Sequence, residues 1–287
     1  MSRIAYVNGR YLPHNAAGVH VEDRGYQFAD GVYEVIAVDS GRMIDAEAHH
    51  VRLERSLAEL GIARPMSRGA LDVVLREVIR RNRVRNGIVY LQVTRGVAPR
   101  DHAFPADATP AVVATARRGG RPAAERVENG VRVVTVPDIR WQRCDIKSVS
   151  LLPNVLAKQA AREAGAFEAW QVDGDGMVTE GSSTNAWIVD QDGNLVTRQL
   201  SNAILSGVTR LVLKDLAAES GIRIIERAFS AEEARGAREA FITSTTSFVM
   251  PVVQIDDRVI GNGRPGSVTR RLVALYGEHL QRNHTKT

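Results

Sequence analysis

The sequence predicts an α+β fold divided into two domains. Hairpin signals and amphipathic helices follow one another without the regular strand–helix alternation of a doubly wound parallel sheet. A composition break at residues 117–122, rich in Arg, Gly and Pro, indicates an exposed boundary. We therefore expect a smaller N-terminal domain over residues 1–118, a linker over 119–126 and a larger C-terminal domain over 127–287.

Turn and periodicity signals define the elements of the first domain. Asn8-Gly9 predicts a hairpin between two short strands, and Asp39-Ser40-Gly41 predicts a second hairpin. Apolar residues at helical spacing predict helices near residues 46–60 and 68–81. Strands are expected over residues 87–94 and 111–116.

The second domain mixes strands and helices in the same way. A strand is expected over residues 131–136, and Pro153 and Gly165 mark the start and end of a helix. A further helix is expected over residues 207–220, and Ser267 is expected to cap the last helix. Additional strands are expected over residues 222–225, 241–243 and 252–255.

Composition excludes several classes of protein. Hydrophobic residues make up 44% and charged residues 25% of the chain, which is typical of a soluble globular protein. The net charge of +5 raises the question of nucleic-acid or membrane partners. The densest basic run, residues 80–85, is better explained as a solvated helix end, and we expect neither partner. The single cysteine, Cys144, and the absence of a signal-peptide pattern at the start favour the cytoplasm.

Lysine is rare in this sequence. Nearly all the positive charge is arginine, and the four lysines are Lys147, Lys158, Lys214 and Lys286. Arginine does not deprotonate in proteins, so it cannot act as an amine nucleophile. A reactive amine, if the chain has one, is therefore among these four residues.

Lys147 differs from the other three lysines in its surroundings. Lys158 and Lys214 lie in helical patterns where a solvated face is expected, and Lys286 lies in the polar tail. Lys147 lies in the alternating stretch 145–150, where a strand would place it on one face with Asp145. The residues alone leave two interpretations open, a catalytic lysine or a half-exposed strand lysine.

Three hydroxyl-rich segments, residues 181–185, 206–209 and 244–247, are candidates for phosphate binding. A glycine-led loop and a helix start both present backbone N–H groups to anions, although simple turns and caps have the same composition. Glu180 directly precedes the first segment. No metal-ligand spacing is found among the histidines, so no metal is expected. A lysine, a phosphate site and a carboxylate are the parts that a pyridoxal 5′-phosphate (PLP) enzyme needs.

Longer motifs carry a resemblance to a known family. They are residues 22–28 (EDRGYQF), 31–35 (GVYEV), 140–141 (RW), 143–148 (RCDIKS), 178–183 (VTEGSS) and 243–247 (TSTTS). On these motifs the chain resembles the class IV aminotransferases of PLP fold type IV, and within them the D-amino-acid aminotransferases. The resemblance covers essentially the whole chain. It implies a smaller N-terminal α/β sandwich domain and a larger C-terminal pseudo-barrel domain that binds PLP.

The resemblance also assigns roles in cofactor binding. Lys147 matches the lysine that forms a Schiff base with PLP and then moves the proton. Glu180 matches the carboxylate that keeps the pyridine nitrogen protonated, so that the ring accepts electrons. Arg52 matches the arginine that binds the cofactor phosphate. The remaining cofactor contacts implied by the resemblance are Ser183, Leu205, Val208, Thr209, Ser244 and Thr245.

Substrate binding is implied for Tyr33, Arg100 and His102. In the D-amino-acid aminotransferases the matching trio binds the substrate α-carboxylate, and the Arg-x-His pair comes from the second subunit, which implies a homodimer. From the sequence alone Arg100 would be an ordinary exposed loop arginine. The resemblance implies ping-pong transamination between D-amino acids, such as D-alanine and D-glutamate, and 2-oxo acids, such as 2-oxoglutarate and pyruvate.

Three alternatives remain beside this interpretation. They are a transaminase for branched-chain L-amino acids or (R)-amines, a lyase of the aminodeoxychorismate type, and a PLP-binding module without activity. Arg100 with His102 argues against the first two, and the complete residue set argues against the third. Phe248 stands where some relatives carry an acid, and His50 and Val51 also depart from the family pattern. Phe248 leaves the breadth of substrates open.

Overall fold

The computed structural model describes residues 3–119 and 121–282, which form two compact units. Unit 1 contains the described residues up to 119 together with Ile146–Ser150. Unit 2 contains the other described residues of the chain. The short segment that carries Lys147 therefore belongs to unit 1, although its neighbours in sequence belong to unit 2.

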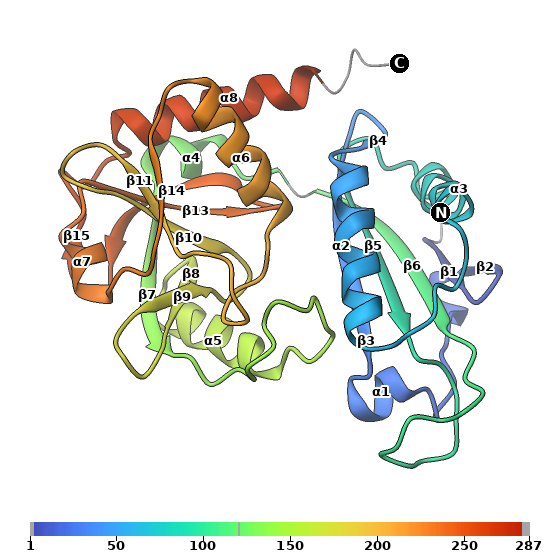
Figure 1. Ribbon diagram of the computed structural model, residues 1–287. Coiled ribbons are helices and arrows are strands. Elements are labelled where there is room, and N and C mark those ends of the chain that lie inside the picture. The colour runs from blue at the N-terminus through green and yellow to red at the C-terminus, as the bar shows by residue number, and fades with distance from the viewer. Residues whose placement is uncertain (1–2, 120, 283–287) are drawn as a thin grey trace. The chain divides into compact units, whose positions relative to one another are not determined.

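Unit 1 is built on a six-stranded antiparallel sheet (Figure 1). Its strands are β1 (Ile4–Val7), β2 (Arg10–Pro13), β3 (Gly31–Asp39), β4 (Arg42–Met43), β5 (Gly87–Thr94) and β6 (Ala111–Arg118). They lie in the order β2-β1-β6-β5-β3-β4. The predicted Asn8-Gly9 hairpin is confirmed, with both turn residues left-handed at φ 44° and 89°. Such a turn matches the twist of the two strands that it joins.

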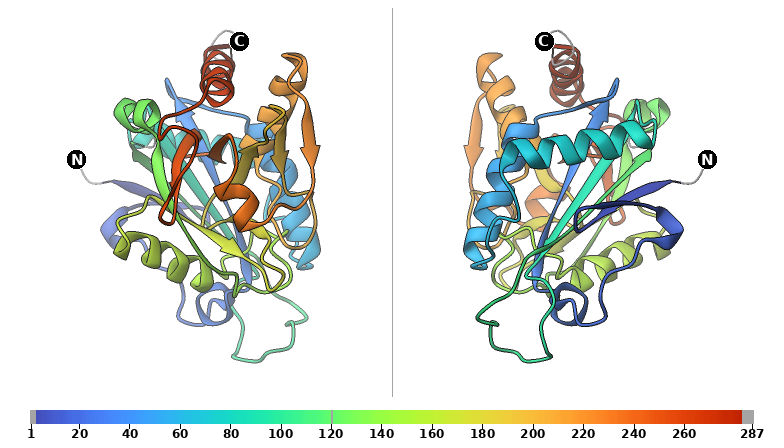
Figure 2. Two further views of the ribbon diagram at one scale, coloured as in Figure 1. Left: turned by 90° about the vertical axis from the view of Figure 1, so that its left-hand side faces the viewer. Right: turned by 90° about the vertical axis from the view of Figure 1, so that its right-hand side faces the viewer.

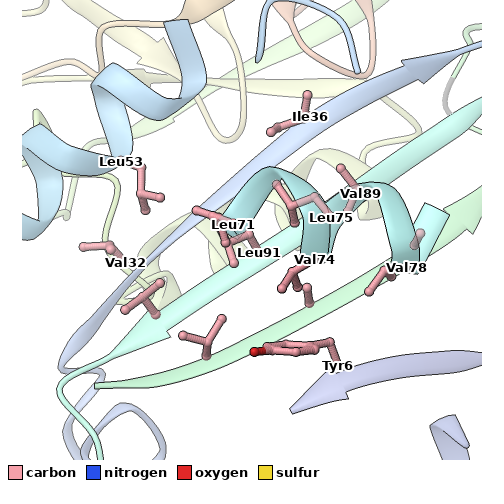
Figure 3. Packing of buried hydrophobic residues seen from close by; sticks show 14 of the residues in the cluster. Tyr6, Val32, Ile36, Leu53, Leu71, Val74, Leu75, Val78, Val89 and Leu91 are labelled. Atoms are coloured by element: carbon pink, nitrogen blue, oxygen red, sulfur yellow. The ribbon is translucent and has the colours of Figure 1, made fainter. Parts of the chain in front are cut away.

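Two long helices cover one face of this sheet. The helices of unit 1 are the short 3₁₀ helix His14–Ala16, α1 (Arg24–Phe28), α2 (Ala46–Glu59) and α3 (Arg68–Arg81). Figure 2 shows α3 crossing the sheet, and Figure 3 shows its apolar residues Leu71, Leu75 and Val78 packed against the strands. The sequence predicted both α2 and α3, because apolar residues recur at helical spacing in each of them. It did not predict the five-residue helix α1.

Alternation along β3 sends adjacent side chains to opposite faces of the sheet. Glu34 shares the helix-covered face with Val32 and Ile36, while Tyr33 lies on the other face. The segment Ile146–Ser150 runs along β3: the Tyr33 N–H donates to the Lys147 carbonyl at 3.0 Å. The Val149 N–H donates to the Gly31 carbonyl, also at 3.0 Å. These bonds fix the backbone at Lys147 against β3.

Unit 2 contains a nine-stranded mixed sheet that curls into a half-barrel. Its strands are β7 (Val131–Pro137), β8 (Glu168–Val172), β9 (Val178–Gly181), β10 (Asn185–Val189), β11 (Leu195–Thr197), β12 (Ile224–Glu226), β13 (Glu239–Ser244), β14 (Phe248–Ile255) and β15 (Arg258–Val259). The order is β12-β11-β10-β13-β14-β7-β8-β9, with β15 paired to β14. This arrangement, with the antiparallel sheet of unit 1, confirms the predicted α+β fold.

Five helices accompany the sheet of unit 2. They are α4 (Ala124–Asn129), α5 (Leu152–Glu163), α6 (Val208–Glu219), α7 (Ala231–Arg235) and α8 (Ser267–Arg282). Trp170, Phe229 and Met250, all nearly inaccessible to solvent, belong to the core of this unit. Helix α4 begins inside the stretch where the sequence indicated a linker.

Two local predictions were wrong. Residues 145–150 do not form a strand, because only Ser148 makes a bridge, to Val32, and the flanking residues turn. Asp145 therefore does not share a strand face with Lys147. Ser267 does not cap α8 from outside but is its first residue. The cap comes from the Glu239 carboxylate, which accepts the N–H groups of Val268 at 3.1 Å and Thr269 at 2.7 Å.

Within residues 3–119 and 121–282, no helix is both long enough and apolar enough to span a membrane.

Candidate functional site

Lys147 lies against an aromatic ring in unit 1. Its amine is 4.2 Å from the centre of the Tyr33 ring, a cation–π distance. The backbone N–H of Lys147 donates to the Ser56 hydroxyl of α2 at 3.3 Å. Within the described residues the amine makes no ion pair, whereas Lys214 pairs with Glu226 at 2.5 Å. The structure thus brings together two predicted site residues, Lys147 and Tyr33.

Arg52 is bound to a carboxylate that the sequence analysis did not assign. Its Nε donates to Glu34 Oε1 at 2.8 Å and its Nη2 to Glu34 Oε2 at 2.7 Å. His49 Nδ1 lies 2.7 Å from the same carboxylate. All three side chains are buried between α2 and β3. The predicted phosphate ligand is therefore half of an internal ion pair in this structure.

The pKa values in this cluster follow from burial and charge. Burial alone would raise the pKa of Glu34, but the charge and hydrogen bonds of Arg52, with those of His49, lower it to about 2. Burial lowers the pKa of His49, and its hydrogen bond to Glu34 only partly opposes this. At neutral pH the cluster therefore holds an ionised Glu34, a cationic Arg52 and a neutral His49.

Arg100 and His102 lie in the long connection between β5 and β6 of unit 1, and both are exposed. The ring of Phe28 lies beside both: it is 5.0 Å from the Arg100 guanidinium carbon and 5.3 Å from the His102 ring centre. The structure therefore places the predicted carboxylate-binding pair together on one exposed loop.

Glu180 lies at the centre of a charged cluster in unit 2. The Arg140 guanidinium donates to Glu180 Oε1 through Nη1, and to Asp138 at 2.9 and 2.7 Å through Nε and Nη2. Burial alone would raise the pKa of Asp138, but hydrogen bonds and the charge of Arg140 lower it. Both carboxylates compete for one cation, and the Glu180 side chain is only 9% exposed.

Glu180 also accepts two neutral donors on its other oxygen. Asn185 Nδ2 donates at 3.0 Å and the Leu205 N–H at 3.1 Å. Asn185 in turn donates to the Leu205 carbonyl at 3.0 Å. A β-carbon at Gly207 would collide with the Asn185 amide, so only glycine permits this close approach. Two predicted cofactor residues, Glu180 and Leu205, are thus in direct contact.

Helix α6 begins at the next two predicted residues, Val208 and Thr209. Its N-cap, Gly207, offers no side-chain hydrogen bond. The first N–H groups of a helix have no intrahelical acceptor, and the helix dipole adds positive potential there. Because the helix has 12 residues and is not capped by a side chain, this end is suited to a phosphate.

The hydroxyl groups of the predicted phosphate-binding segments have different hydrogen-bond partners. The Ser183 hydroxyl donates to the buried Glu168 carboxylate at 3.1 Å. The Ser244 hydroxyl accepts the Ser247 N–H at 3.0 Å and stabilises the turn between β13 and β14. Thr245 is half-buried in that turn. Ser183 and Ser244 therefore both have roles inside the protein.

The structure adds two candidate functional residues, Glu34 and Arg140, to which the sequence assigned no role. Glu34 had a detectable signal, because it shares the apolar face of a strand with Val32 and Ile36. A buried carboxylate on such a face requires a cation. Arg140 had no comparable local signal, since its partner Glu180 is 40 residues away in the chain.

Comparison with known proteins places this geometry in a family. The model of the family described as amino-transferase class IV matches residues 31–255. The chain is 44% identical over 280 residues to a D-alanine aminotransferase of Bacillus licheniformis, covering 98% of both chains. It is 40% identical over 277 residues to a D-alanine aminotransferase of Staphylococcus haemolyticus, covering 96% of this chain and 97% of that one.

Solved structures agree at the level of the fold. The branched-chain amino acid aminotransferase of Escherichia coli superposes with a TM-score of 0.88 at 27% identity, covering 96% of this chain and 94% of that one. A second branched-chain amino acid aminotransferase, solved with pyridoxamine 5′-phosphate, also gives 0.88, at 26% identity over 97% of this chain and 94% of that one. The resemblance expected from the motifs is confirmed, and the chain belongs to the class IV aminotransferase family.

Proposed function

We propose that this chain transfers the amino group of D-alanine to a 2-oxo acid, with PLP held covalently by Lys147. The main support for this activity is the full-length identity of 44% to a D-alanine aminotransferase. The position of the Lys147 amine, beside Tyr33 and outside any ion pair of the described residues, supports the assignment of the reactive group. D-glutamate, 2-oxoglutarate and pyruvate are the other substrates that we expect.

Bound PLP supplies a ring that accepts the electrons released when the substrate loses its Cα proton. Lys147 removes that proton from Cα and returns it at the C4′ atom of the cofactor. An amine without a fixed carboxylate partner is suited to this task, because it must both lose and regain a proton. The four-lysine composition supports the same residue, since arginine cannot replace a reactive amine.

Glu180 is proposed to lie beside the pyridine nitrogen and to keep it protonated. Support comes from its charge: Arg140 is shared between Glu180 and Asp138, so one guanidinium faces two carboxylates. A pyridinium beside Glu180 would bring a second cation to these two carboxylates and one guanidinium. Leu205 is proposed to pack on the ring, and its backbone is already fixed to Glu180.

The phosphate is proposed to bind at the start of α6. The uncapped N–H groups of Val208 and Thr209 fit an anion, and Ser183, Ser244 and Thr245 are proposed as further contacts. Arg52 is proposed on its motif alone. Because Glu34 already binds its guanidinium, the phosphate would share Arg52 with that carboxylate.

Tyr33, Arg100 and His102 are proposed to bind the α-carboxylate, with Arg100 and His102 supplied by a second subunit. A homodimer is supported by exposed apolar residues of unit 1: Val21 is 72%, Tyr26 75% and Phe104 65% exposed. Interaction surfaces expose large apolar side chains of this kind. A cytoplasmic location is proposed from the single cysteine.

The test is a half-reaction with the PLP-loaded enzyme. Adding D-alanine without an acceptor should lower the absorbance of the lysine-bound cofactor and raise that of its amino form. L-alanine is the matched control and should leave the spectrum unchanged. An unchanged spectrum with D-alanine would contradict the proposal.

The fold similarity to branched-chain aminotransferases keeps one second candidate in view. L-leucine and an (R)-amine therefore belong in the same titration. A response to either, combined with no response to D-alanine, would favour the sister activity.

A further inference from the structure

The loop that carries Arg100 and His102 is held by one buried arginine of α1. The Arg24 Nη1 donates to the Asp101 carbonyl at 2.6 Å, and its Nη2 donates to the His102 carbonyl at 3.3 Å. Arg24 is only 3% exposed, although the loop that it binds is exposed. Two adjacent carbonyls on one guanidinium fix the direction of the backbone between them.

Phe28, at the other end of α1, contacts the side chains of the same loop. The Arg24 guanidinium carbon is 4.9 Å from the Phe28 ring centre, and that of Arg100 is 5.0 Å away. The His102 ring lies 5.3 Å from it at an angle of 51°. One aromatic ring thus positions both side chains of the predicted carboxylate-binding pair, while Arg24 positions their backbone.

The helix itself is fixed to the end of β5. Asp30 accepts from Arg24 Nε at 2.8 Å and from Arg95 Nε at 2.7 Å, so two arginines share its carboxylate. The Arg24 N–H donates to the Gly96 carbonyl at 2.9 Å. A β-carbon at Gly25 would collide with Thr94, so α1 packs closely on β5. Figure 1 shows α1 beside the loop at the same end of the sheet.

Arg95 adds a second attachment to the same loop further along. Its guanidinium carbon lies 3.6 Å from the centre of the Phe104 ring, and its Nη atoms donate to the carbonyls of Leu60 and Gly61. The loop is therefore fixed at two places, by Arg24 at the carbonyls of Asp101 and His102 and by Arg95 beyond the pair at Phe104.

From these contacts we propose that Arg24, acting with Phe28, is a positioning residue that presets the carboxylate-binding loop. The inference rests on the proposed role of Arg100 and His102 in binding the substrate. Arg24 does not touch the substrate; it holds the carbonyls of Asp101 and His102 so that Arg100 and His102 project together. A loop already ordered before binding loses less entropy when the substrate arrives.

The consequence concerns both substrates of the reaction. The amino acid and the 2-oxo acid each carry an α-carboxylate, so a displaced loop weakens the binding of both. Lys147 and Glu180 carry out the chemistry and cofactor binding, so neither kcat nor the affinity for PLP depends on this loop. Because a misplacement of about 1 Å can cost about 100-fold, we expect KM to rise between about 10-fold and 100-fold.

The experiment starts with four variants of the PLP-loaded enzyme, and a fifth, Phe28→Leu, is added below. Arg24→Lys keeps the charge but loses the fork that binds two carbonyls. Arg68→Lys is the matched control, because Arg68 also binds carboxylates, Glu47 and Glu54, but touches neither α1 nor the loop. Arg100→Met tests the proposed function itself, and Arg24→Lys with Arg100→Met closes the cycle.

The measured quantities are KM for D-alanine and for the 2-oxo acid, kcat, the inhibition constant of propionate, and the affinity for PLP. Propionate has the carboxylate but no amino group, so it reports on carboxylate binding alone. Arg24→Lys should raise both KM values and the inhibition constant and leave kcat and PLP affinity within about twofold, which is under 0.5 kcal/mol. Arg68→Lys should change none of them.

The double variant separates positioning from a general structural effect. If Arg24 acts through Arg100, adding Arg24→Lys to Arg100→Met should raise KM much less than it does in the wild type. Full multiplication of the two effects would overturn the inference, as would an unchanged KM in Arg24→Lys. An unchanged KM in Arg100→Met would instead overturn the proposed function of that residue.

Arg24→Lys is a substitution at a buried position, so the fold needs its own check. Phe28→Leu keeps the apolar volume and removes the aromatic ring, and it should raise KM in the same direction by a smaller factor. Melting temperature and molecular mass in solution are measured for every variant. An effect of Arg24→Lys or Phe28→Leu that follows loss of folding or of assembly, with kcat falling too, would overturn the inference.

Discussion

Units 1 and 2 each bury a glutamate against an arginine, but they balance its charge differently. In unit 1 the Glu34 carboxylate faces the Arg52 guanidinium, with a neutral His49 beside them. In unit 2 the Arg140 guanidinium is divided between the carboxylates of Glu180 and Asp138. Counted over these side chains alone, the first set has one cation and one anion, and the second has one cation and two anions.

This difference gives the two buried pairs different electrostatic capacities. A pair with one cation and one anion fixes two elements together, and a phosphate that binds its arginine has to share the guanidinium with the carboxylate. A buried carboxylate whose cation is shared can still stabilise a cation brought by a ligand. The two glutamates are similarly buried and both bind an arginine, but we expect them to have different functions. The number of charged groups around each glutamate accounts for this difference.

The largest effect is expected from replacing Lys147 of unit 1 by arginine, which removes the amine but keeps a positive charge. Lys147→Arg should lower kcat by about 10⁴-fold or more, because both proton transfer and covalent binding of PLP are lost. Borohydride reduction followed by peptide mapping should locate the cofactor on Lys147 in the wild type. Lys158→Arg is the control and should keep full activity. Cofactor fixed to another lysine would contradict the assignment.

The next effect tests the balanced cluster. Glu34→Gln removes the carboxylate of a buried ion pair with Arg52, and breaking such a pair costs about 3–5 kcal/mol of unfolding free energy. Urea denaturation of the loaded enzyme measures this loss. Glu77→Gln is the control, because Glu77 binds Arg80 and Arg81 at the surface, where solvent screens the charges and such pairs contribute little to stability. A loss for Glu34→Gln no larger than that of the control would refute the comparison.

The same variant predicts a dependence on pH. The pKa of Glu34 is lowered from 4.5 to about 2, so its stabilising contribution is complete above 4.5 and is lost as the pH falls towards 2. Over that range the stability of the wild type should fall more steeply than that of Glu34→Gln. Parallel curves for the two proteins would show that Glu34 is not the titrating group.

A smaller effect is expected from removing the excess charge of unit 2. Glu180→Gln keeps the shape but removes the negative charge, and its amide nitrogen cannot accept the hydrogen bonds that one of the two carboxylate oxygens accepts. A preorganised electrostatic contact of this kind contributes about 10²–10³-fold to kcat. Steady-state kinetics with D-alanine measures the change. If kcat stayed within a factor of two, the charge of Glu180 would have no catalytic role.

The smallest effect comes from balancing the unit 2 cluster without touching Glu180. Asp138→Asn leaves Arg140 to Glu180 alone, so the three side chains become neutral as in unit 1. We expect kcat to fall by about tenfold, equivalent to about 1.4 kcal/mol. Kinetics and the melting temperature are measured together. A fall equal to that of Glu180→Gln would show that Asp138 acts on its own rather than through shared charge.

Local patterns were enough to predict much of the fold. The Asn8-Gly9 hairpin, α2 and α3 follow from turn chemistry and apolar spacing within a few residues. Helix α1 was missed because its five residues show no full helical period, and its stability comes from the bond of Arg24 to Asp30 and from that of Asp23 to Thr94 of β5. The cap of α8 was missed because Glu239 is 28 residues before the helix start.

Motifs predicted the candidate residues but not their partners. Lys147 and Glu180 follow from the four-lysine composition and the family motifs. The charge balance of Glu34 with Arg52, and of Glu180 with Arg140, depends on pairs 18 and 40 residues apart. No local pattern encodes such a pairing, because only the folded sheets bring the partners together.

The edge strands of both sheets are short. Unit 1 ends in β2, which closes with Pro13, and in β4, which has two residues. Unit 2 ends in β12 and β9, with three and four residues. Borders this short expose few unsatisfied backbone groups, and proline donates none. The folded chain therefore resists the edge-to-edge stacking that starts aggregation, and association with another copy has to depend on side chains.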